Sequence, residues 1–356
     1  MPGATGDQMD FGVMNCMAAV ITGEPTALDL YLQDALQDSC RPTHFCEADG
    51  SLVRSRNHPQ WECWDQETHF NAGVSLDRLG KAPFTNKETH GWHGRDNQHW
   101  SSNLICCSYY LTGDPQLALL IDHECETYLA QQILPLPPFR PGWPGTGPDA
   151  ARAVGRTMLA GSWMYLCTGR VDIKERIKQR IDLSIYPGWQ GRQIGYPYYR
   201  PYMISKTDGR QTPIPLNSDA SFPWQEGIAA TGLEAAYRIT GQDNARELAA
   251  EIARCMCDFG WQWRAGHTDA QVANCIVWNQ GNDVDRYDPL KFQPADGTDF
   301  MLWVQPATIL AASVYQNSQD AQALANIVQA RYVTPPSDGG PGRYQQWSTV
   351  LGAPIT

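Results

Sequence analysis

The sequence predicts an all-α fold in which helical hairpins follow one another through a single domain spanning residues 1–356. Three observations lead to this prediction. A short Thr-Gly turn recurs along the chain, an apolar stretch precedes each copy, and an amphipathic stretch follows it. No low-complexity linker divides the chain, and its length is sufficient for one large hydrophobic core.

The turn consists of Thr, Gly and a polar residue. Glycine in this position can adopt the left-handed conformation that ends a helix, and Asp114 or Asp243 can cap the helix that follows. Four complete copies and one degraded copy occur, at Thr22-Gly23-Glu24, Thr112-Gly113-Asp114, Thr168-Gly169-Arg170, Thr240-Gly241-Gln242 and Asn317-Ser318-Gln319.

The stretches before the turns are apolar on nearly all sides and rich in Ala and Gly. A helix that is apolar all round is buried all round, and small residues let its neighbours approach closely. We therefore predict inner helices over 9–21, 98–111, 151–167, 226–239 and 301–316.

The stretches after the turns carry one apolar stripe at helical spacing, which predicts outer helices with a solvated face. The stripes consist of Leu117, Leu120, Ile121 and Tyr128, of Ile173, Ile177 and Ile181, and of Leu248, Ile252, Ala253 and Met256.

A closed ring of such hairpins resembles the (α/α) toroid, or six-hairpin glycosidase-like, class of proteins. The resemblance covers roughly two-thirds of the chain and lies in the rhythm of the hairpins, not in a catalytic motif. Five hairpins are recognisable, and residues 66–81 are the best candidate for part of a sixth. The alternatives are an incomplete ring, a fragment of a longer chain, and an open α-solenoid, which the uneven spacing of the turns disfavours.

Long loops are predicted on one face of the ring, between each outer helix and the next inner helix. They carry most of the aromatic and polar residues, and loops of this length usually serve a function. A Pro- and Gly-rich tail, 333–356, is predicted to pack as an extended strap. The loops are 40–95, 133–150, 186–224 and 258–300.

Composition excludes several classes of function. The formal charge of −11 argues against a nucleic-acid or anionic-membrane partner. No apolar run is long enough to span a membrane, and no phosphate-binding or dinucleotide-binding glycine motif occurs. No cofactor and no metal are predicted.

The cysteines and the start of the chain bear on its compartment. The 11 cysteines are scattered through apolar segments, which predicts buried thiols and not a disulfide framework, with Cys40 and Cys46 as an alternative loop staple. No signal peptide is visible. A cytoplasmic or virion-associated location is therefore favoured over a secreted one, unless a leader was removed.

The repeat also defines a common level in the predicted ring. Fourteen residues before each turn stand Gln8, Gln98, Val154 and Glu226, with Trp303 at the fifth copy. If the inner helices are parallel, these residues share one level at the helix N-termini, where anions and hydrogen-bond acceptors are favoured. In the toroid enzymes that the chain resembles, the active site lies in such a funnel.

The densest group of reactive side chains is His90-Gly-Trp-His-Gly-Arg-Asp-Asn-Gln-His-Trp100. Asp96 is a candidate general acid or base, and His99, three residues later, is a candidate for orienting the substrate. Arg95 can hold a carboxylate through its planar guanidinium. The alternatives are a polar network that supports the loops, a helix cap for Asp96, and a metal site, for which the carboxylate ligands are missing. His93, Gln98 and Trp100 complete the candidate substrate-binding residues of this segment.

A second candidate is Glu226, which opens an inner helix after Phe222-Pro-Trp224-Gln. A carboxyl group there would be partly desolvated, which favours the protonated form that a general acid needs. Asp65 and Glu67 are further candidates for a second carboxylate. The alternative for Glu226 is a structural role, either as a helix cap or as a carboxylate at the edge of the hydrophobic core.

Aromatic side chains of the loops are candidates for a saccharide groove. Flat rings stack on the apolar faces of sugars while polar groups bind their hydroxyls. A rigid packed loop is the alternative, because Tyr and Pro alternate in 196–202. The candidates are Trp61, Trp64, Trp189, Tyr198, Arg200, Trp224 and Trp278.

The sequence therefore predicts a carbohydrate-active enzyme, most simply a glycoside hydrolase that acts on a poly- or oligosaccharide through Asp96 and Glu226. The resemblance also allows a polysaccharide lyase that cleaves a uronate polymer by β-elimination, with Asn97, His99, Tyr198 and Arg200 in the corresponding roles. A non-catalytic glycan-binding protein or virion scaffold is the third alternative, and an oligomer is compatible with each of them. A lipid-processing toroid is disfavoured, because no Asp-rich metal motif is present.

Overall fold

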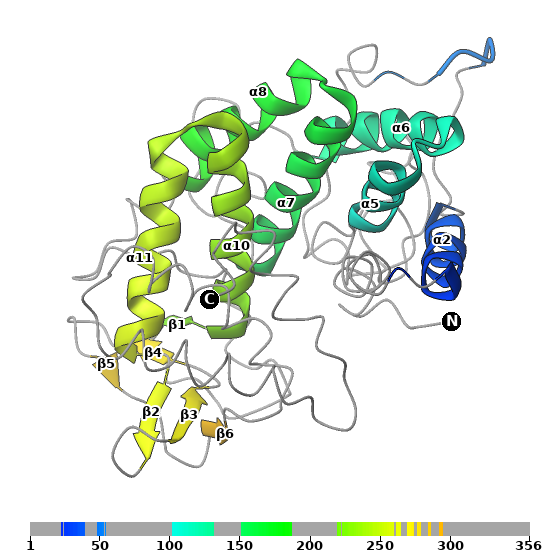
Figure 1. Cartoon of the computed structure of the whole chain (residues 1–356). Coiled ribbons are helices and arrows are strands. Elements are labelled where there is room, and N and C mark those ends of the chain that lie inside the picture. Colours follow the sequence, from blue (N-terminus) through cyan, green and yellow to red (C-terminus); the bar gives the residue numbers. More distant parts are fainter. Residues whose placement is uncertain are drawn as a thin grey trace, which may run out of the picture. The chain divides into compact units, whose positions relative to one another are not determined.

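A computed structural model of the chain describes four long segments and several short ones (Figure 1). They fall into two compact units, Met1–Gly147 with Arg156–Ser184, and Pro148–Gly155 with Ile185–Thr356. That both belong to one domain remains a prediction. The described residues are 23, 25–39, 48–52, 54, 102–131, 151–186, 219–221, 223–259, 261–264, 269–273, 276–278, 284–285 and 292–294.

The described helices follow the predicted order. The first unit contains α2 (Pro25–Ser39), α5 (Asn103–Thr112), α6 (Pro115–Gln131), most of α7 (Ala151–Thr168) and α8 (Val171–Arg180), which a single π-helical turn, η2 (Ile181–Ile185), extends. The second unit contains the start of α7, α10 (Pro223–Thr240) and α11 (Asp243–Phe259).

Three complete hairpins confirm the predicted unit, namely α5–α6, α7–α8 and α10–α11. In each, a Thr-Gly pair separates the inner helix from the outer one. Of the first hairpin the structure describes the turn glycine, Gly23, and the outer helix α2. The inner helix over 9–21, the fifth hairpin, the candidate sixth over 66–81 and the strap over 333–356 lie outside the described residues.

The threonine of the turn fixes the junction with its hydroxyl group. The hydroxyls of Thr112, Thr168 and Thr240 donate to the carbonyl four residues earlier at 2.7–2.8 Å. Each also accepts the N–H two residues later at 3.2 Å. One side chain thus links the two helices: it adds a second donor to a carbonyl near the end of the inner helix, and it accepts the N–H of the residue that precedes the outer helix.

The turn glycine adopts the predicted left-handed conformation, with φ of +66° at Gly113 and Gly169 and +73° at Gly241. Its N–H donates to a tyrosine carbonyl in each hairpin, that of Tyr109, Tyr165 or Tyr237. In the last two hairpins a cation of the outer helix lies over the ring of this tyrosine, Lys174 over Tyr165 and Arg246 over Tyr237. Asp114 caps α6 by accepting the N–H of Gln116, as predicted, whereas Asp243 is the first residue of α11.

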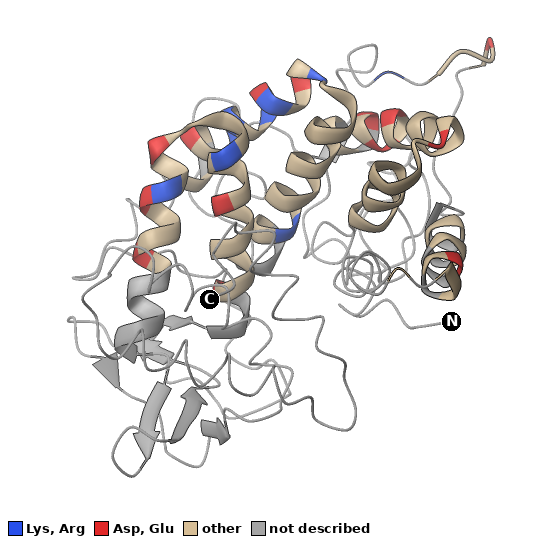
Figure 2. Ribbon diagram, viewed as in Figure 1, with Lys and Arg blue, Asp and Glu red and all other residues tan. Residues whose placement is uncertain are grey.

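The outer helices bury their apolar stripes. Ile173, Ile177, Ile181, Ile121, Tyr128 and Leu248 are completely buried, and Leu117 and Ile252 nearly so. Leu120 is only half-buried, and the side chains of Ala253 and Met256 lie outside the described part. Charged residues gather on α8 and α11, while α5 has none (Figure 2).

The inner helices are buried along most of their length but not at their C-terminal ends. The last turns of α5 and α7 expose Tyr110, Leu111 and Leu166, with 64%, 38% and 48% of their surface accessible. The prediction that these helices are buried on all sides is wrong there. A helix that ends in a surface turn brings its last residues to the surface whatever their polarity, and single exposed apolar residues are common.

The predicted loops 186–224 and 258–300 contain short strands that the sequence did not suggest. Strand β1 (Asp219–Ser221) pairs with β4 (Ile276–Trp278), which pairs with β5 (Val284–Asp285). Strand β3 (Asp269–Ala273) lies between β2 (Trp261–Arg264) and β6 (Phe292–Pro294). All of these pairings are antiparallel.

The described cysteines are free thiols, as predicted. Cys106, Cys107 and Cys125 are buried and Cys167 partly so. Burial raises the pKa of Cys106 well above its usual value, which keeps this thiol protonated and inert. Cys40 and Cys46 lie outside the described residues. None of the described helices is long and apolar enough to cross a membrane.

The threonine hydroxyl should account for a measurable part of each hairpin's stability. Thr240→Val keeps the shape of the side chain but removes both hydrogen bonds, so we expect the free energy of unfolding to fall by about 1–2 kcal/mol. Thr240→Ser keeps the hydroxyl and should stay within about 0.5 kcal/mol of the wild type. Urea titration followed by circular dichroism measures both, and equal losses would contradict the role of the hydroxyl.

Candidate functional site

Glu226 lies in the first turn of α10, at the end of the hairpin opposite its Thr-Gly turn. The residue is only 3% exposed. It is followed by Ile228, Ala229 and Ala230, which are buried as well. The first-turn N–H groups of a helix favour negative charge, while an apolar environment opposes it. Glu226 thus combines burial with a position suited to proton transfer.

The α7–α10 contact supports the common level of the inner helices. Gly155, thirteen residues before Thr168, packs against the backbone of Ile228 and Gly232, which precede Thr240 by twelve and eight residues. The start of α7 is therefore in direct backbone contact with the N-terminal half of α10.

Strand β1 connects the predicted loop 258–300 to the start of α10, because it pairs with β4 of that loop. The strand ends at Ser221 and α10 begins at Pro223, so β1 leads directly into the first turn that carries Glu226. Asp219 of β1 is paired with Trp278 of β4. The backbone of Trp278 is thereby held near the start of α10, and Trp224 belongs to the first turn of this helix.

The other candidate residues lie outside the described part of the chain, so their roles remain predictions. They include the proposed partner carboxylate and the whole histidine-rich segment. These residues are Trp61, Trp64, Asp65, His93, Arg95, Asp96, Gln98, His99, Trp100, Trp189, Tyr198 and Arg200.

Several polar residues are buried within the inner helices and were not predicted from the sequence. Asn103 begins α5, Arg156 and Thr157 lie in the second turn of α7, and Thr231 lies in α10; all are at most 5% exposed. The hydroxyl of Thr231 donates to the carbonyl of Gly227 at 2.9 Å. The signal that could have revealed them is a polar side chain in a helix that is otherwise apolar on all sides.

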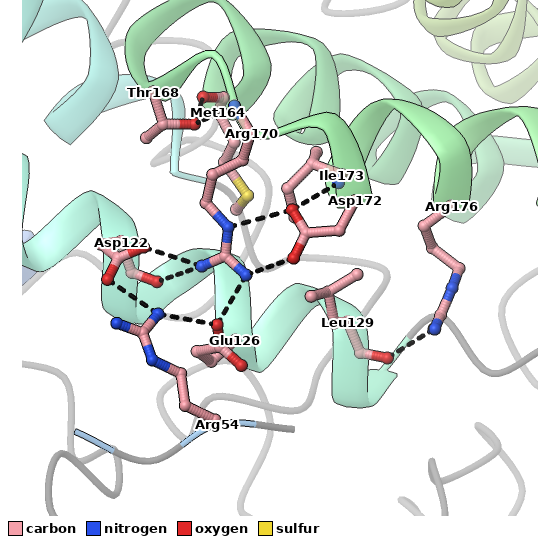
Figure 3. Close-up of polar contacts among 10 residues, drawn as sticks. All are labelled: Arg54, Asp122, Glu126, Leu129, Met164, Thr168, Arg170, Asp172, Ile173 and Arg176. Carbon is pink, nitrogen blue, oxygen red and sulfur yellow. Dashed lines mark hydrogen bonds and ion pairs between the residues drawn. The ribbon is translucent and has the colours of Figure 1, made fainter. Parts of the chain in front are cut away.

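A second polar cluster surrounds Arg170, the residue that follows the Thr168-Gly169 turn (Figure 3). Its guanidinium contacts Asp122 at 2.8 Å, Glu126 at 2.6 Å and Asp172 at 2.6 Å. Arg54 joins the same cluster by pairing with Asp122 at 2.9 Å and Glu126 at 3.0 Å. We refer to these five residues as the Arg170 network.

Mutual stabilisation dominates the electrostatics of this network. Burial would lower the pKa of Arg170, but the hydrogen bond to Asp172 and the charge of Glu126 raise it above the usual value. Burial would likewise raise the pKa of Asp172, yet the hydrogen bond and charge of Arg170 lower it. Both groups are therefore held in their charged forms.

The Arg170 network is structural. It lies at the turn of the α7–α8 hairpin, and it joins α6 to the start of α8 and to Arg54. Its carboxylates are already occupied by guanidinium groups, which leaves them poorly suited to proton transfer. Among the residues that the structure describes, no group of three His, Cys, Asp or Glu could hold a metal ion.

Removing Arg170 should destabilise the protein strongly. Arg170→Met leaves Glu126, whose side chain is 5% exposed, without its nearest cation, and breaking such a pair costs about 3 kcal/mol. Arg238→Met is the matched control, because it breaks the solvent-exposed pair with Glu234, which is worth at most about 0.5 kcal/mol. Denaturant titration compares the two, and a similar small loss in both would contradict the analysis.

The contribution of Asp172 should depend on pH. A lowered pKa stabilises the fold above the unfolded-state pKa of about 3.9, and this stabilisation disappears as the pH falls through the folded-state pKa. We expect Asp172→Asn to be less stable than the wild type at pH 7, with a difference that shrinks below about pH 4. Glu175→Gln, which removes a surface pair with Lys178, should show little pH-dependent difference. Thermal unfolding from pH 7 to pH 3 tests this.

Comparison with known proteins identifies the fold. No family model matches the chain, and no curated protein matches its sequence. Among solved structures, it is similar to a polysaccharide lyase with a TM-score of 0.52 and 11% identity, over 99% of this chain and 92% of the other. It is also similar to a sugar epimerase from a ruminal bacterium with a TM-score of 0.50 and 11% identity, over 98% of this chain and 87% of the other.

Both of these proteins act on carbohydrates, and both are six-hairpin, glycosidase-like (α/α) toroid enzymes. The similarity extends over nearly the whole chain at an identity that reveals shared architecture alone. It agrees with the three complete hairpins and with the contact between the start of α7 and α10. The chain therefore has an (α/α) toroid fold.

Proposed function

We propose that this protein is a carbohydrate-active enzyme, specifically a glycoside hydrolase that cleaves a poly- or oligosaccharide. The observation that carries the proposal is the burial of Glu226 in the first turn of α10, where it is 3% exposed. A shared fold does not by itself define a reaction. The toroid fold and its two carbohydrate-active neighbours add support to this position of the carboxyl group.

In the proposed reaction Glu226 is the general acid. Its proton passes to the glycosidic oxygen as the bond to the anomeric carbon breaks, so that the leaving group departs as a neutral alcohol. Burial suits this role, because an apolar environment disfavours the ionised form of the carboxyl group. The first-turn N–H groups would then stabilise the carboxylate that remains.

Asp96 is the proposed second carboxylate. It would either activate a water molecule on the opposite face of the sugar or attack the anomeric carbon itself, depending on its separation from Glu226. His99 and Arg95 would position the substrate. Trp224 and Trp278 are proposed to provide aromatic surfaces for sugar stacking, which is compatible with the position of their backbones at the start of α10.

Replacing the acid should abolish turnover without unfolding the protein. We expect Glu226→Gln to lower kcat by about 100-fold or more, because general acid catalysis contributes at least this factor. Glu234→Gln, on the same helix but paired with Arg238, is the control and should retain wild-type kcat. The measurement is the release of reducing ends from a panel of glycans.

Asp96→Asn should cause a comparable loss in the same assay, because both carboxylates act in one reaction. Full activity in both Glu226→Gln and Asp96→Asn would refute the site. Formation of an ultraviolet-absorbing unsaturated product would indicate a lyase and direct attention to His99 and Tyr198. Tight glycan binding without any turnover would indicate a non-catalytic protein.

A further inference from the structure

Helices α7 and α10 are in direct backbone contact where they cross, at Gly155 and Gly232. A β-carbon on Gly155 would meet the carbonyl group of Ile228 and the backbone nitrogen of Ala229, the latter at 2.6 Å. A β-carbon on Gly232 would meet the carbonyl group and the α-carbon of Gly155. Each glycine thus presents its α-carbon to a carbonyl oxygen of the other helix, an arrangement typical of Cα–H···O contacts between tightly packed helices.

This crossing has no flexible partner that could make room for a larger residue. At both glycines the three nearest atoms that a new β-carbon would meet belong to the backbone of a helix. Val154, Ile228, Ala229 and Ala230 around it are at most 3% exposed. A side chain at either glycine would therefore force the two helices apart, because close-packed interiors transmit such a strain instead of absorbing it.

The crossing lies within two turns of Glu226. Ile228, whose carbonyl touches Gly155, follows Glu226 by two residues in the same helix. The hydroxyl of Thr231 is tied to the carbonyl of Gly227, which adds a side-chain bond to the helical ones in this segment. A displacement of α10 at the crossing is therefore carried to Glu226 by a continuous helix.

We propose that Gly155 and Gly232 are positioning residues that set the place of the Glu226 carboxyl group at the start of α10. The inference rests on the proposed function, in which Glu226 is the general acid. The two glycines touch no substrate. They act by allowing direct backbone contact between α7 and α10, and no residue with a side chain can replace that contact.

Gly161 offers a matched control in the same helix α7. A β-carbon there would meet the hydroxyl of Tyr128 at 2.6 Å and the side chain of Ile177 at 3.1 Å. Both belong to the outer helices α6 and α8. Gly161→Ala thus crowds a buried contact of α7 with those two helices and not with α10.

The first experiment compares the kinetics of Gly232→Ala, Gly155→Ala and Gly161→Ala under conditions in which each is fully folded. We expect kcat to fall by about 100-fold in the first two variants, because a shift of about 1 Å in a catalytic group has this effect. Gly161→Ala should retain kcat even if it is equally destabilised. Wild-type kcat in Gly232→Ala and Gly155→Ala, or an equal loss in Gly161→Ala, would overturn the inference.

A double-mutant cycle then tests whether the glycine acts through Glu226. In the Glu226→Gln background, Gly232→Ala should lower the residual activity by less than twofold, since its target is already gone. A further loss of about 100-fold in that background would show that Gly232 acts elsewhere, and the inference would fail while Glu226 kept its role.

A second readout does not depend on turnover. A water-soluble carbodiimide with an amine labels accessible carboxyl groups, and peptide mass spectrometry measures the labelling of Glu226. We expect at least a threefold increase over the wild type in Gly232→Ala and no increase in Gly161→Ala. An unchanged rate in Gly232→Ala would overturn the positioning role. If Glu226→Gln is fully active, the proposed function fails instead, and this labelling still decides whether the glycines place Glu226.

Should Gly232→Ala not fold, Ala229→Gly probes the same crossing by removing one buried methyl group. The backbone nitrogen of Ala229 faces Gly155. We therefore expect Ala229→Gly to change kcat and labelling in the same direction as Gly232→Ala, but by less. No change in either readout for this folded variant would count against the inference.

Discussion

The hydroxyl group of one threonine per hairpin holds the described architecture together. It donates to the last turn of the inner helix and accepts from the residue before the outer helix, while the adjacent glycine turns the chain with a positive φ. Each hydroxyl therefore links the end of one helix to the residue that precedes the next, which fixes a short junction between the two helices.

The two ends of the hairpins differ in how their polar groups are satisfied. At the turn end, local hydrogen bonds and the Arg170 network satisfy the polar groups, and apolar residues such as Tyr110 reach the surface. At the other end, α10 begins with a buried glutamate and a direct backbone contact to α7. Charges at the turn end are mutually neutralised and serve stability, whereas the carboxyl group of Glu226 is buried in the first turn of its helix.

Much of the fold could be predicted from the sequence, but less of the candidate site. The Thr-Gly turns and the stripe of Ile173, Ile177 and Ile181 depend on local conformational preference and on helical spacing, which a sequence displays directly. The small strands of the predicted loops depend on pairing between β1 and β4, which are more than fifty residues apart. The Arg170 network likewise joins Arg54, Asp122 and Arg170 from three separate segments. Local sequence patterns do not predict ion pairs between residues that are so far apart in the chain.

The sequence by itself determined the hairpin unit, the boundaries of α7 and α10 to within a few residues, and the choice of Glu226 as a buried carboxylate. These features follow from interactions within one or two turns of the chain. Tertiary structure alone decided that Gly155 meets Ile228 and Gly232, that Arg170 gathers three carboxylates, and that the backbone of Trp278 lies beside the strand leading to α10. The physical reason is that close packing and charge pairing depend on which segments are in contact, and the residues of one segment do not predict which other segment packs against it.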